Sequence, residues 1–174
     1  SSPSGIPNWT SFGLLQDSEV TLGDFDGIWG ADLATATTNS KNSIYFSERR
    51  GMRDSFTVND TKTRYDVAWG DWDGDGDLDL AEANFGAPVR IYENNSIATS
   101  PSTRLNIAWT AGLTQDSMAL AWGDYDDDGD LDLAVANMSD TDRLYGNPLN
   151  GSMVLDWQST SSNAARDVEW GDWD

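Results

Sequence analysis

Apolar and polar residues alternate over short runs in this sequence, and turn-forming residues separate the runs. Between positions 65 and 110 the runs cover residues 65–70, 78–84, 89–93 and 105–110. A period of two, rich in β-branched and aromatic residues and bounded by Gly, Pro, Asn and Asp, predicts short β-strands. No stretch shows a sustained period of 3.6 residues, so no helix is predicted. The pattern therefore predicts an all-β chain with four strands in this interval.

The same pattern recurs along the chain. AWGDWDGDGDLDLAEAN (68–84) matches AWGDYDDDGDLDLAVAN (121–137) without a gap, TLGDFDGIWGADLATAT (21–37) is a degraded copy, and EWGDWD (169–174) begins a fourth. The glycines that precede these loops, Gly23, Gly70, Gly123 and Gly171, are 47, 53 and 48 residues apart. An aromatic residue lies 14 positions before each glycine, at Trp9, Phe56, Trp109 and Trp157. We therefore expect a single domain, 1–174, with units at about 8–55, 56–108 and 109–156 and a partial unit at 157–174.

Four strands in each unit of about 50 residues are typical of β-propeller blades. The predicted fold is all-β, with blades of four antiparallel strands and about three and a half blades in this chain. Propellers have 4–8 blades, so this count predicts a partial propeller. Open sheet edges favour association. The expected partners are the remaining blades of a longer chain or a second copy, and open stacking in a filament is a third possibility.

Composition and charge exclude several classes of function. The formal net charge is −20, from 30 acidic and 10 basic residues, which argues against nucleic-acid and anionic-membrane surfaces. The sequence has no Cys and no His, which removes Ser-His-Asp triads, Cys nucleophiles and ordinary zinc sites. No apolar run reaches the roughly 18 residues of a membrane span. Nine Trp, five Tyr and five Phe argue against disorder.

The acidic loops have the spacing D-x-D-x-D-G-D-x-D. Side chains at positions 1, 3, 5 and 9 and a backbone carbonyl at position 7 can surround a hard cation, and Gly at position 6 allows a sharp bend. The predicted ligands are Asp71, Asp73, Asp75, Asp77 by its carbonyl, and Asp79 in one loop, and Asp124, Asp126, Asp128, Asp130 by its carbonyl, and Asp132 in the next. Calcium accepts six to eight oxygen ligands, whereas magnesium keeps water. The sequence therefore predicts about two Ca²⁺ ions.

The other two copies of the loop are incomplete. Asp24, Asp26 and Asp32 fill positions 1, 3 and 9 of the first copy, but Ile28 and Trp29 occupy positions 5 and 6. We expect weak binding or none there, and we expect Ile28 and Trp29 to pack in the space of an ion-bound loop. The alternative is an exposed Trp29 that stacks on a sugar or a partner. The fourth copy offers only Asp172 and Asp174.

An EF-hand is the main rival interpretation of the complete loops, because it shares these positions and has Glu at position 12. Glu82 stands at position 12 of the second unit, but Val135 and Thr35 stand there in the third and first units. The residues that follow each loop alternate as strands. We therefore interpret Glu82 as a strand residue that faces water or a neighbour.

At these residues the chain resembles the FG-GAP/VCBS repeat family. The resemblance rests on the two Asp-rich loops, on the DLDLA segments after them and on Phe85-Gly86-Ala87-Pro88, where the third unit has NMSD (137–140) instead. It covers nearly all of residues 8–174. It implies an integrin-α-like propeller in which each acidic loop joins the first two strands of a blade and holds calcium. Such propellers resemble modules of adhesion proteins, secreted lectins and a few polysaccharide-processing enzymes.

Three functional hypotheses follow. The first is a calcium-binding, non-catalytic propeller module at the cell surface or outside the cell, for adhesion or for binding a glycan or a protein. The second is a structural subunit of a cell-surface layer or filament. The third is a polysaccharide lyase or hydrolase, which without His or Cys needs a carboxylate pair or Tyr with Arg. The acidic residues outside the loops form no recognisable catalytic constellation, so the non-enzymatic hypothesis is favoured.

Overall fold

The computed structural model describes residues 17–28, 30–38, 42–49, 51–57, 63–95, 105–149, 151–162 and 164–172. Every regular element in these ranges is a β-strand, and the described residues contain no helix, so none that could cross a membrane. The strands are β1 (Asp17–Gly23), β2 (Asp32–Thr37), β3 (Ser43–Glu48), β4 (Gly51–Thr57), β5 (Thr63–Gly70), β6 (Asp79–Ala87), β7 (Arg90–Asn94), β8 (Leu105–Thr110), β9 (Gln115–Gly123), β10 (Asp132–Asn137), β11 (Arg143–Gly146) and β12 (Val154–Gln158). The all-β prediction is confirmed.

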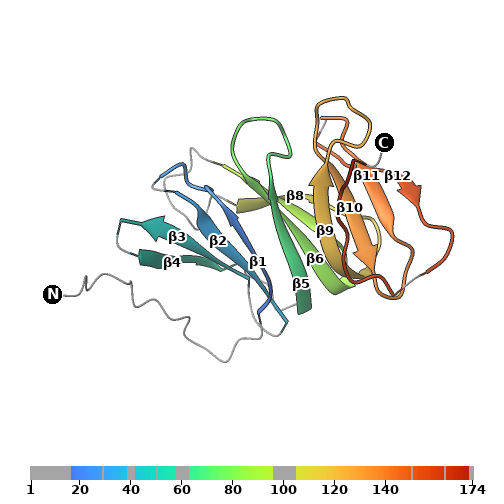
Figure 1. The fold of residues 1–174 in the computed structure, drawn as a ribbon, viewed down its shortest axis with the longest axis horizontal. Coiled ribbons are helices and arrows are strands. Elements are labelled where there is room, and N and C mark those ends of the chain that lie inside the picture. The colour runs from blue at the N-terminus through green and yellow to red at the C-terminus, as the bar shows by residue number, and fades with distance from the viewer. Residues whose placement is uncertain are drawn as a thin grey trace.

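The strands form three successive antiparallel meanders: β1–β4, β5–β8 and β9–β12. The first meander is a sheet by itself. A short ladder between β6 and β9, which pairs Phe85 with Asp116 and Ala87 with Gln115, joins the other two into one curled eight-stranded sheet. Figure 1 shows the three meanders in a row along the molecule, in chain order.

The first two strands of each meander pair in the same register. The glycine that ends the first strand lies opposite the aspartate that begins the second, in the pairs Gly23–Asp32, Gly70–Asp79 and Gly123–Asp132. The ladder is also interrupted at the same place each time, near residues 18, 65 and 118. A bulge bends its strand and increases the local twist. The three acidic loops therefore begin and end on equivalent backbone geometry.

The apolar core lies between successive meanders. One cluster joins Phe25, Ile44 and Phe46 of the first meander to Val67 and Leu80 of the second. A second cluster joins residues of the second meander to residues of the third: Ala81, Val89 and Ile91 contact Leu120, Leu133 and Val135. Because burial of apolar area drives packing, each meander is stabilised chiefly by its neighbours in the row.

A tryptophan of one meander lies over a glycine of the meander before it. A Cβ atom added to Gly23, Gly70 or Gly123 would lie 2.9, 2.8 or 2.7 Å from Cδ1 of Trp69, Trp122 or Trp170, respectively. Such contacts are too close for a side chain, so the repeated glycine is required by the approach of the ring. Two of the rings also donate Nε1–H to a backbone carbonyl of the preceding meander, Trp122 to Ala68 (3.2 Å) and Trp170 to Ala121 (3.1 Å).

Glu82 lies at the centre of a polar network between the first two meanders. Its side chain and that of Arg64 are both 0% exposed, and Arg64 Nε donates to Glu82 Oε1. Asn42 of the first meander donates to the same oxygen at 2.8 Å, and Tyr92 Oη–H donates to Oε2 at 3.0 Å. Of the two predicted environments, Glu82 therefore has the second: it faces a neighbour and is shielded from water.

Candidate metal centre

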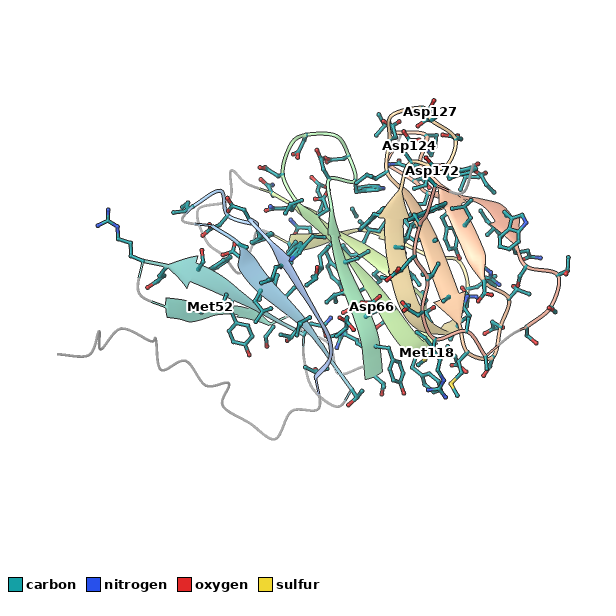
Figure 2. All side chains as sticks on the ribbon, viewed as in Figure 1. Met52, Asp66, Met118, Asp124, Asp127 and Asp172 are labelled. Atoms are coloured by element: carbon teal, nitrogen blue, oxygen red, sulfur yellow. The ribbon has the colours of Figure 1, made fainter. Side chains whose placement is uncertain are left out.

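The three acidic loops, residues 24–32, 71–79 and 124–132, each connect the first strand of a meander to the second. They lie along one edge of the molecule, at the top of Figure 1. Figure 2 shows Asp124 and Asp127 at this edge, and Asp172 of the fourth copy is beside them in the same view. The repeat thus places all of its described acidic loops on one side of the sheets.

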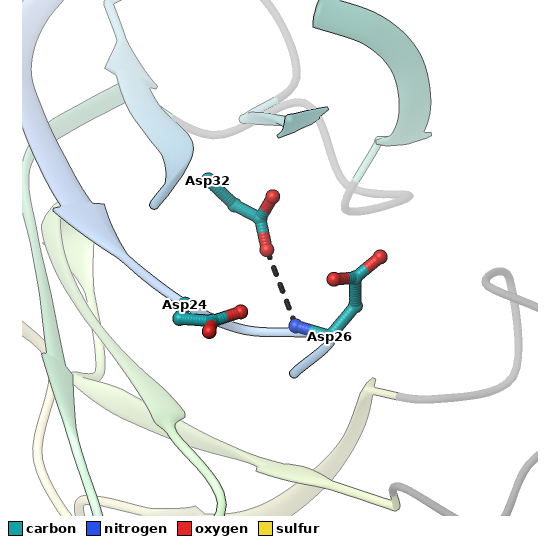
Figure 3. Close-up of side chains that lie close together, drawn as sticks. All are labelled: Asp24, Asp26 and Asp32. Carbon is teal, nitrogen blue, oxygen red and sulfur yellow. Dashed lines mark hydrogen bonds between the residues drawn. The ribbon is translucent and has the colours of Figure 1, made fainter. Parts of the chain in front are cut away.

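Carboxylate oxygens from positions 1, 3 and 9 converge in each loop. The groups are Asp24, Asp26 and Asp32; Asp71, Asp73 and Asp79; and Asp124, Asp126 and Asp132, and in each group one oxygen from every residue lies within 4.8 Å of the others. Figure 3 shows the first group, with the three carboxylates turned toward a common space. Each group could hold a metal ion. The degenerate first loop therefore brings its remaining carboxylates together as the complete loops do.

The aspartate at position 9 anchors the loop to the sheet. In the second loop, Asp79 Oδ2 accepts the backbone N–H of Trp72 (2.8 Å), and Oδ1 accepts that of Asn94 in β7 (2.8 Å). The corresponding bonds join Asp32 to Phe25 and Ser47 (2.9 and 2.7 Å) and Asp132 to Tyr125 and Asn147 (3.0 and 2.9 Å). All three aspartates are buried. The predicted ligand at position 9 thus also ties the loop to the third strand or, in the third meander, to the residue that follows that strand.

The aspartates at positions 1 and 5 shape the turn inside the complete loops. Asp71 Oδ2 accepts the N–H of Gly76 at 3.0 Å, and Asp75 Oδ1 accepts the N–H of Asp77 at 2.9 Å. The third loop repeats these bonds, from Gly129 to Asp124 (2.9 Å) and from Asp130 to Asp128 (3.0 Å). Gly76 and Gly129 have φ of 95° and 96°, as the predicted sharp bend requires. Of the predicted side-chain ligands in the two complete loops, Asp75 and Asp128 at position 5 are not part of the converging groups.

The second loop contains a buried carboxylate oxygen, Oδ1 of Asp71, that has no hydrogen-bond partner among the described residues. Burial raises the pKa of Asp79 to about 7, against the lowering effect of the N–H groups of Asn94 and Trp72, and Asp73 and Asp75 raise it further. Burial likewise raises the pKa of Asp73. Unpaired buried carboxylates are costly, and a bound cation removes this cost by pairing with the ionised form. The oxygen-only donor set fits a hard cation.

The first loop reaches a similar fold without the full acidic set. Ile28 N–H donates to Asp26 Oδ1 at 2.9 Å, and Ser47 Oγ–H donates to the carbonyl of Gly30 at 2.9 Å. The Ile28 side chain is 46% exposed, so the expectation that it packs in place of an ion is wrong. Because Ile28 is exposed, the converging side chains of this loop are those of Asp24, Asp26 and Asp32. Trp29 and Asp174 lie outside the described residues.

The aromatic residue at position 2 serves the scaffold in two of the loops. Phe25 and Trp72 are buried, and Trp72 Nε1 contacts Met153 Sδ at 3.1 Å. Tyr125 differs because it is exposed and its Oη–H donates to Asp156 Oδ2 at 2.9 Å. That hydrogen bond is the main cause that raises the pKa of Tyr125 to about 12. Trp173, the fourth member of this position, lies outside the described residues.

Sequence reasoning missed two asparagines that join neighbouring loops. Asn94 Nδ2 donates to the carbonyl of Phe25 at 3.0 Å, and Asn147 Nδ2 donates to the carbonyl of Trp72 at 2.7 Å. Each asparagine follows a tyrosine by two residues, in Tyr92-Glu93-Asn94 and Tyr145-Gly146-Asn147. This shared Tyr-x-Asn was the signal available in the sequence. The first meander has Ser47 at the same place.

A hollow of about 900 Å³ lies where the first strands of the meanders approach one another. β1, β5, β9 and residues 166–170 all contribute to its wall, among them the acidic residues Glu19, Asp66, Asp167 and Glu169. Asp66 bridges two meanders, because its carboxylate accepts the N–H of Val67 (2.8 Å) and that of Leu120 (2.7 Å). Burial raises the pKa of Asp66 to about 6, the two N–H groups lower it, and Glu19 and Asp167 raise it.

No protein-family model matches this chain, and no curated protein matches it. The candidate metal centre is therefore described by its own geometry. Each of three equivalent loops has three converging carboxylates, and the one at position 9 belongs to the buried aspartate that anchors the loop.

Proposed function

We propose that the chain is a calcium-binding, non-catalytic β-propeller module. The observation that carries this proposal is the convergence of three carboxylates in each of three equivalent loops, one of which has a buried, unpartnered oxygen at Asp71. In the second loop the converging carboxylates of Asp71, Asp73 and Asp79 supply three ligands, and the proposal adds Asp75, which stands outside that group, and the carbonyl of Asp77, for five in all. Calcium accepts such a set and completes it with water, whereas magnesium requires a smaller and more regular cage. The second and third loops are the two proposed sites.

Three features support propeller blades as the architecture. The meanders repeat one strand order and one register, the apolar cores lie between them, and their first strands line a common hollow. In a propeller the blades pack face to face, with their first strands around a central channel. The meanders are then three blades, and residues 164–172 are the start of a fourth. The ring is completed by further blades from the same chain or from a second copy.

The proposed role is adhesion, or the binding of a glycan or protein, at the cell surface or outside the cell. Calcium is abundant there, and modules with dissociation constants on the order of 10⁻⁴–10⁻³ M are loaded under those conditions. Each ion offsets part of the repulsion within a loop of a chain whose formal net charge is −20. The ions thus stabilise the edge that carries the loops, and the exposed parts of that edge are left for a ligand.

Thermal unfolding with calcium, with magnesium and with EDTA tests the metal proposal. A ligand present at 100 times its dissociation constant stabilises a protein by about 2.7 kcal/mol for each site, so calcium is expected to raise the melting temperature clearly. Magnesium at the same concentration should raise it less. Identical melting curves in calcium and EDTA would contradict the proposal.

A pair of matched variants assigns the effect to the loops. Asp73→Asn with Asp126→Asn removes a ligand charge from each complete loop and keeps an oxygen that can accept the N–H bond within the turn. This double variant should lose most of the calcium-dependent rise. Asp77→Asn with Asp130→Asn changes the charge equally but alters residues that ligate through their carbonyls, so most of the rise should remain. Equal losses in the two double variants would mean that only net charge matters.

A further inference from the structure

A continuous series of hydrogen bonds runs from the first acidic loop through the second to the third. Asn94 Nδ2 donates to the carbonyl of Phe25 (3.0 Å), and its N–H donates to Asp79 Oδ1 (2.8 Å). Asp79 Oδ2 accepts the N–H of Trp72 (2.8 Å), and the carbonyl of Trp72 accepts Asn147 Nδ2–H (2.7 Å). Asn147 N–H donates to Asp132 Oδ1 (2.9 Å), and Asp132 Oδ2 accepts the N–H of Tyr125 (3.0 Å).

Each asparagine in this series holds two loops at once. The backbone N–H of Asn147 binds the position 9 aspartate of its own loop, and its side chain binds the carbonyl at position 2 of the loop before it. Asn147, Trp72 and both aspartates are buried. Water therefore does not compete for these bonds, and each is stronger than the same bond at an exposed site. Trp72 and Asn147 thus connect Asp79 to Asp132.

We propose that Asn147 is a positioning residue that couples ion binding in the second loop to ion binding in the third. This inference rests on the proposed calcium function and adds an interaction between its two sites. An ion in the second loop fixes Asp79 and, through its N–H, the Trp72 residue whose carbonyl Asn147 contacts. The third loop then loses less conformational freedom when its own ion binds. The coupling is therefore positive, and it is reciprocal because it is a free energy between two sites.

The first loop provides an internal control for this coupling. Asn94 makes the same two bonds as Asn147, but it joins the second loop to a loop that lacks the carboxylate at position 5. The Asn94 link therefore leads to a loop where binding is weak or absent. Ser47 shows that serine fits this position and still donates its N–H to the position 9 aspartate, at 2.7 Å. Asn→Ser thus removes the link between loops and keeps the anchor within the loop.

Calorimetric titration with calcium alone measures the coupling through a cycle of variants. Asp73→Asn disables the second loop and leaves all ligands of the third in place. With Asn147 present, the third loop should bind calcium at least about five-fold more weakly in Asp73→Asn than in the intact chain. In the Asn147→Ser background, Asp73→Asn should leave the affinity of the third loop unchanged. In the Asn94→Ser background, the five-fold effect should persist.

A second readout separates coupling from simple destabilisation. Asn147→Ser and Asn94→Ser each remove a side-chain bond to the preceding loop, so in EDTA their melting temperatures should fall by similar amounts. Only Asn147→Ser should also abolish the calcium-dependent slowing of Trp72 N–H exchange that an ion in the third loop produces.

The outcomes distinguish this inference from the proposed function. Two ions that bind independently in the wild-type chain overturn the coupling and leave the calcium function standing. Coupling that survives Asn147→Ser, or that is equally lost in Asn94→Ser, overturns the assignment to Asn147. The absence of any calcium binding overturns the proposed function and this inference with it.

Discussion

The first and second meanders share a backbone plan but differ in the charges placed on it. Asp32 and Asp79 make equivalent hydrogen bonds to position 2 of the loop and to the third strand, and Asp32 also accepts the N–H of Asp26 at 3.2 Å. Around this common anchor, the second meander adds Asp75 at position 5 of the loop and Glu82 at position 12, where the first has Ile28 and Thr35. Two roles are thus separable: the buried aspartate shapes the loop, and the additional acids belong to the proposed cation site or to the junction with a neighbour.

The largest difference between the two meanders is expected at position 12. Four donors, from Asn42, Arg64, Asn84 and Tyr92, converge on the Glu82 carboxylate. Glu82→Gln replaces a buried acceptor by an amide and removes the charge opposite Arg64, so we expect a loss of about 3–5 kcal/mol. Thr35→Val replaces a buried hydroxyl by a methyl group of similar size and removes no charge, so it should cost about 1 kcal/mol or less. Urea unfolding of both variants measures this, and equal losses would mean that the polar network adds nothing.

The shared anchor predicts equal effects in the absence of metal. Asp79→Ala leaves two backbone N–H groups without their carboxylate, and Asp32→Ala leaves three, the third through a longer bond from Asp26 (3.2 Å). Each variant should therefore cost about 3 kcal/mol in EDTA. In calcium the Asp79→Ala variant should lose more than Asp32→Ala, because a complete site is lost as well. Urea unfolding of both variants in the two buffers gives the four values. A much smaller cost for Asp32→Ala in EDTA would show that the anchors are not equivalent.

The dependence of stability on pH should separate Asp66 from Glu19, which occupy the same repeat position in β5 and β1. Burial raises the pKa of Asp66 from 3.8 to about 6, so the folded protein binds this proton more tightly than the unfolded chain. The favourable contribution is complete below about pH 4, declines as the pH rises, and is lost above about pH 6. Its upper limit is about 3 kcal/mol.

Asp66→Asn and Glu19→Gln provide the corresponding measurement. In EDTA, Asp66→Asn should remove between about 1 and 3 kcal/mol of the change in unfolding free energy between pH 4.5 and 7. Glu19 is exposed, and Glu19→Gln should leave that slope almost unchanged. If the two variants flatten the curve equally, the pH dependence reflects the overall negative charge rather than the buried bridge from β5 to β9.

The smallest effect on stability, and the most direct test of the comparison, comes from giving the first loop the residues of the second. Ile28→Asp, Trp29→Gly and Gly30→Asp together restore positions 5, 6 and 7. Because Asp24, Asp26 and Asp32 already converge, this variant should bind one more calcium ion than the wild type. Calorimetric stoichiometry measures the gain. An unchanged number of ions would show that the loops differ by more than these three residues.

The repeat and the alternation were enough to predict the strands of this molecule. The predicted runs 65–70, 78–84, 89–93 and 105–110 correspond to β5, β6, β7 and β8, because each was bounded by turn residues and flanked by equivalent copies. Propeller closure stayed a prediction, because the arrangement of blades depends on contacts that alternation does not encode. The recurring spacing was also enough to single out the aspartates at positions 1, 3 and 9, whose carboxylates converge in each loop, and their role as metal ligands stays a prediction.

The residues that sequence reasoning misjudged act between meanders. Glu82 was interpreted only as a strand residue that faces water or a neighbour, because its partners Asn42 and Arg64 are 40 and 18 positions away in the sequence. Asn94 and Asn147 were missed because their role depends on a carbonyl about 70 residues earlier in the chain. Ile28 was expected to pack in place of an ion, but it is exposed. Local patterns contain no information on such distant partners.

The contact between a tryptophan and a glycine of the preceding repeat recurs at each junction of the row, so the junctions are separate and similar units of packing. Because the apolar core is divided between the junctions of the row, we expect a pulling force along the row to separate the meanders in steps. Each rupture would release a segment of 47 to 53 residues, the spacing of the glycines. A molecule built in this way yields in steps and can re-form one joint while its neighbours remain closed.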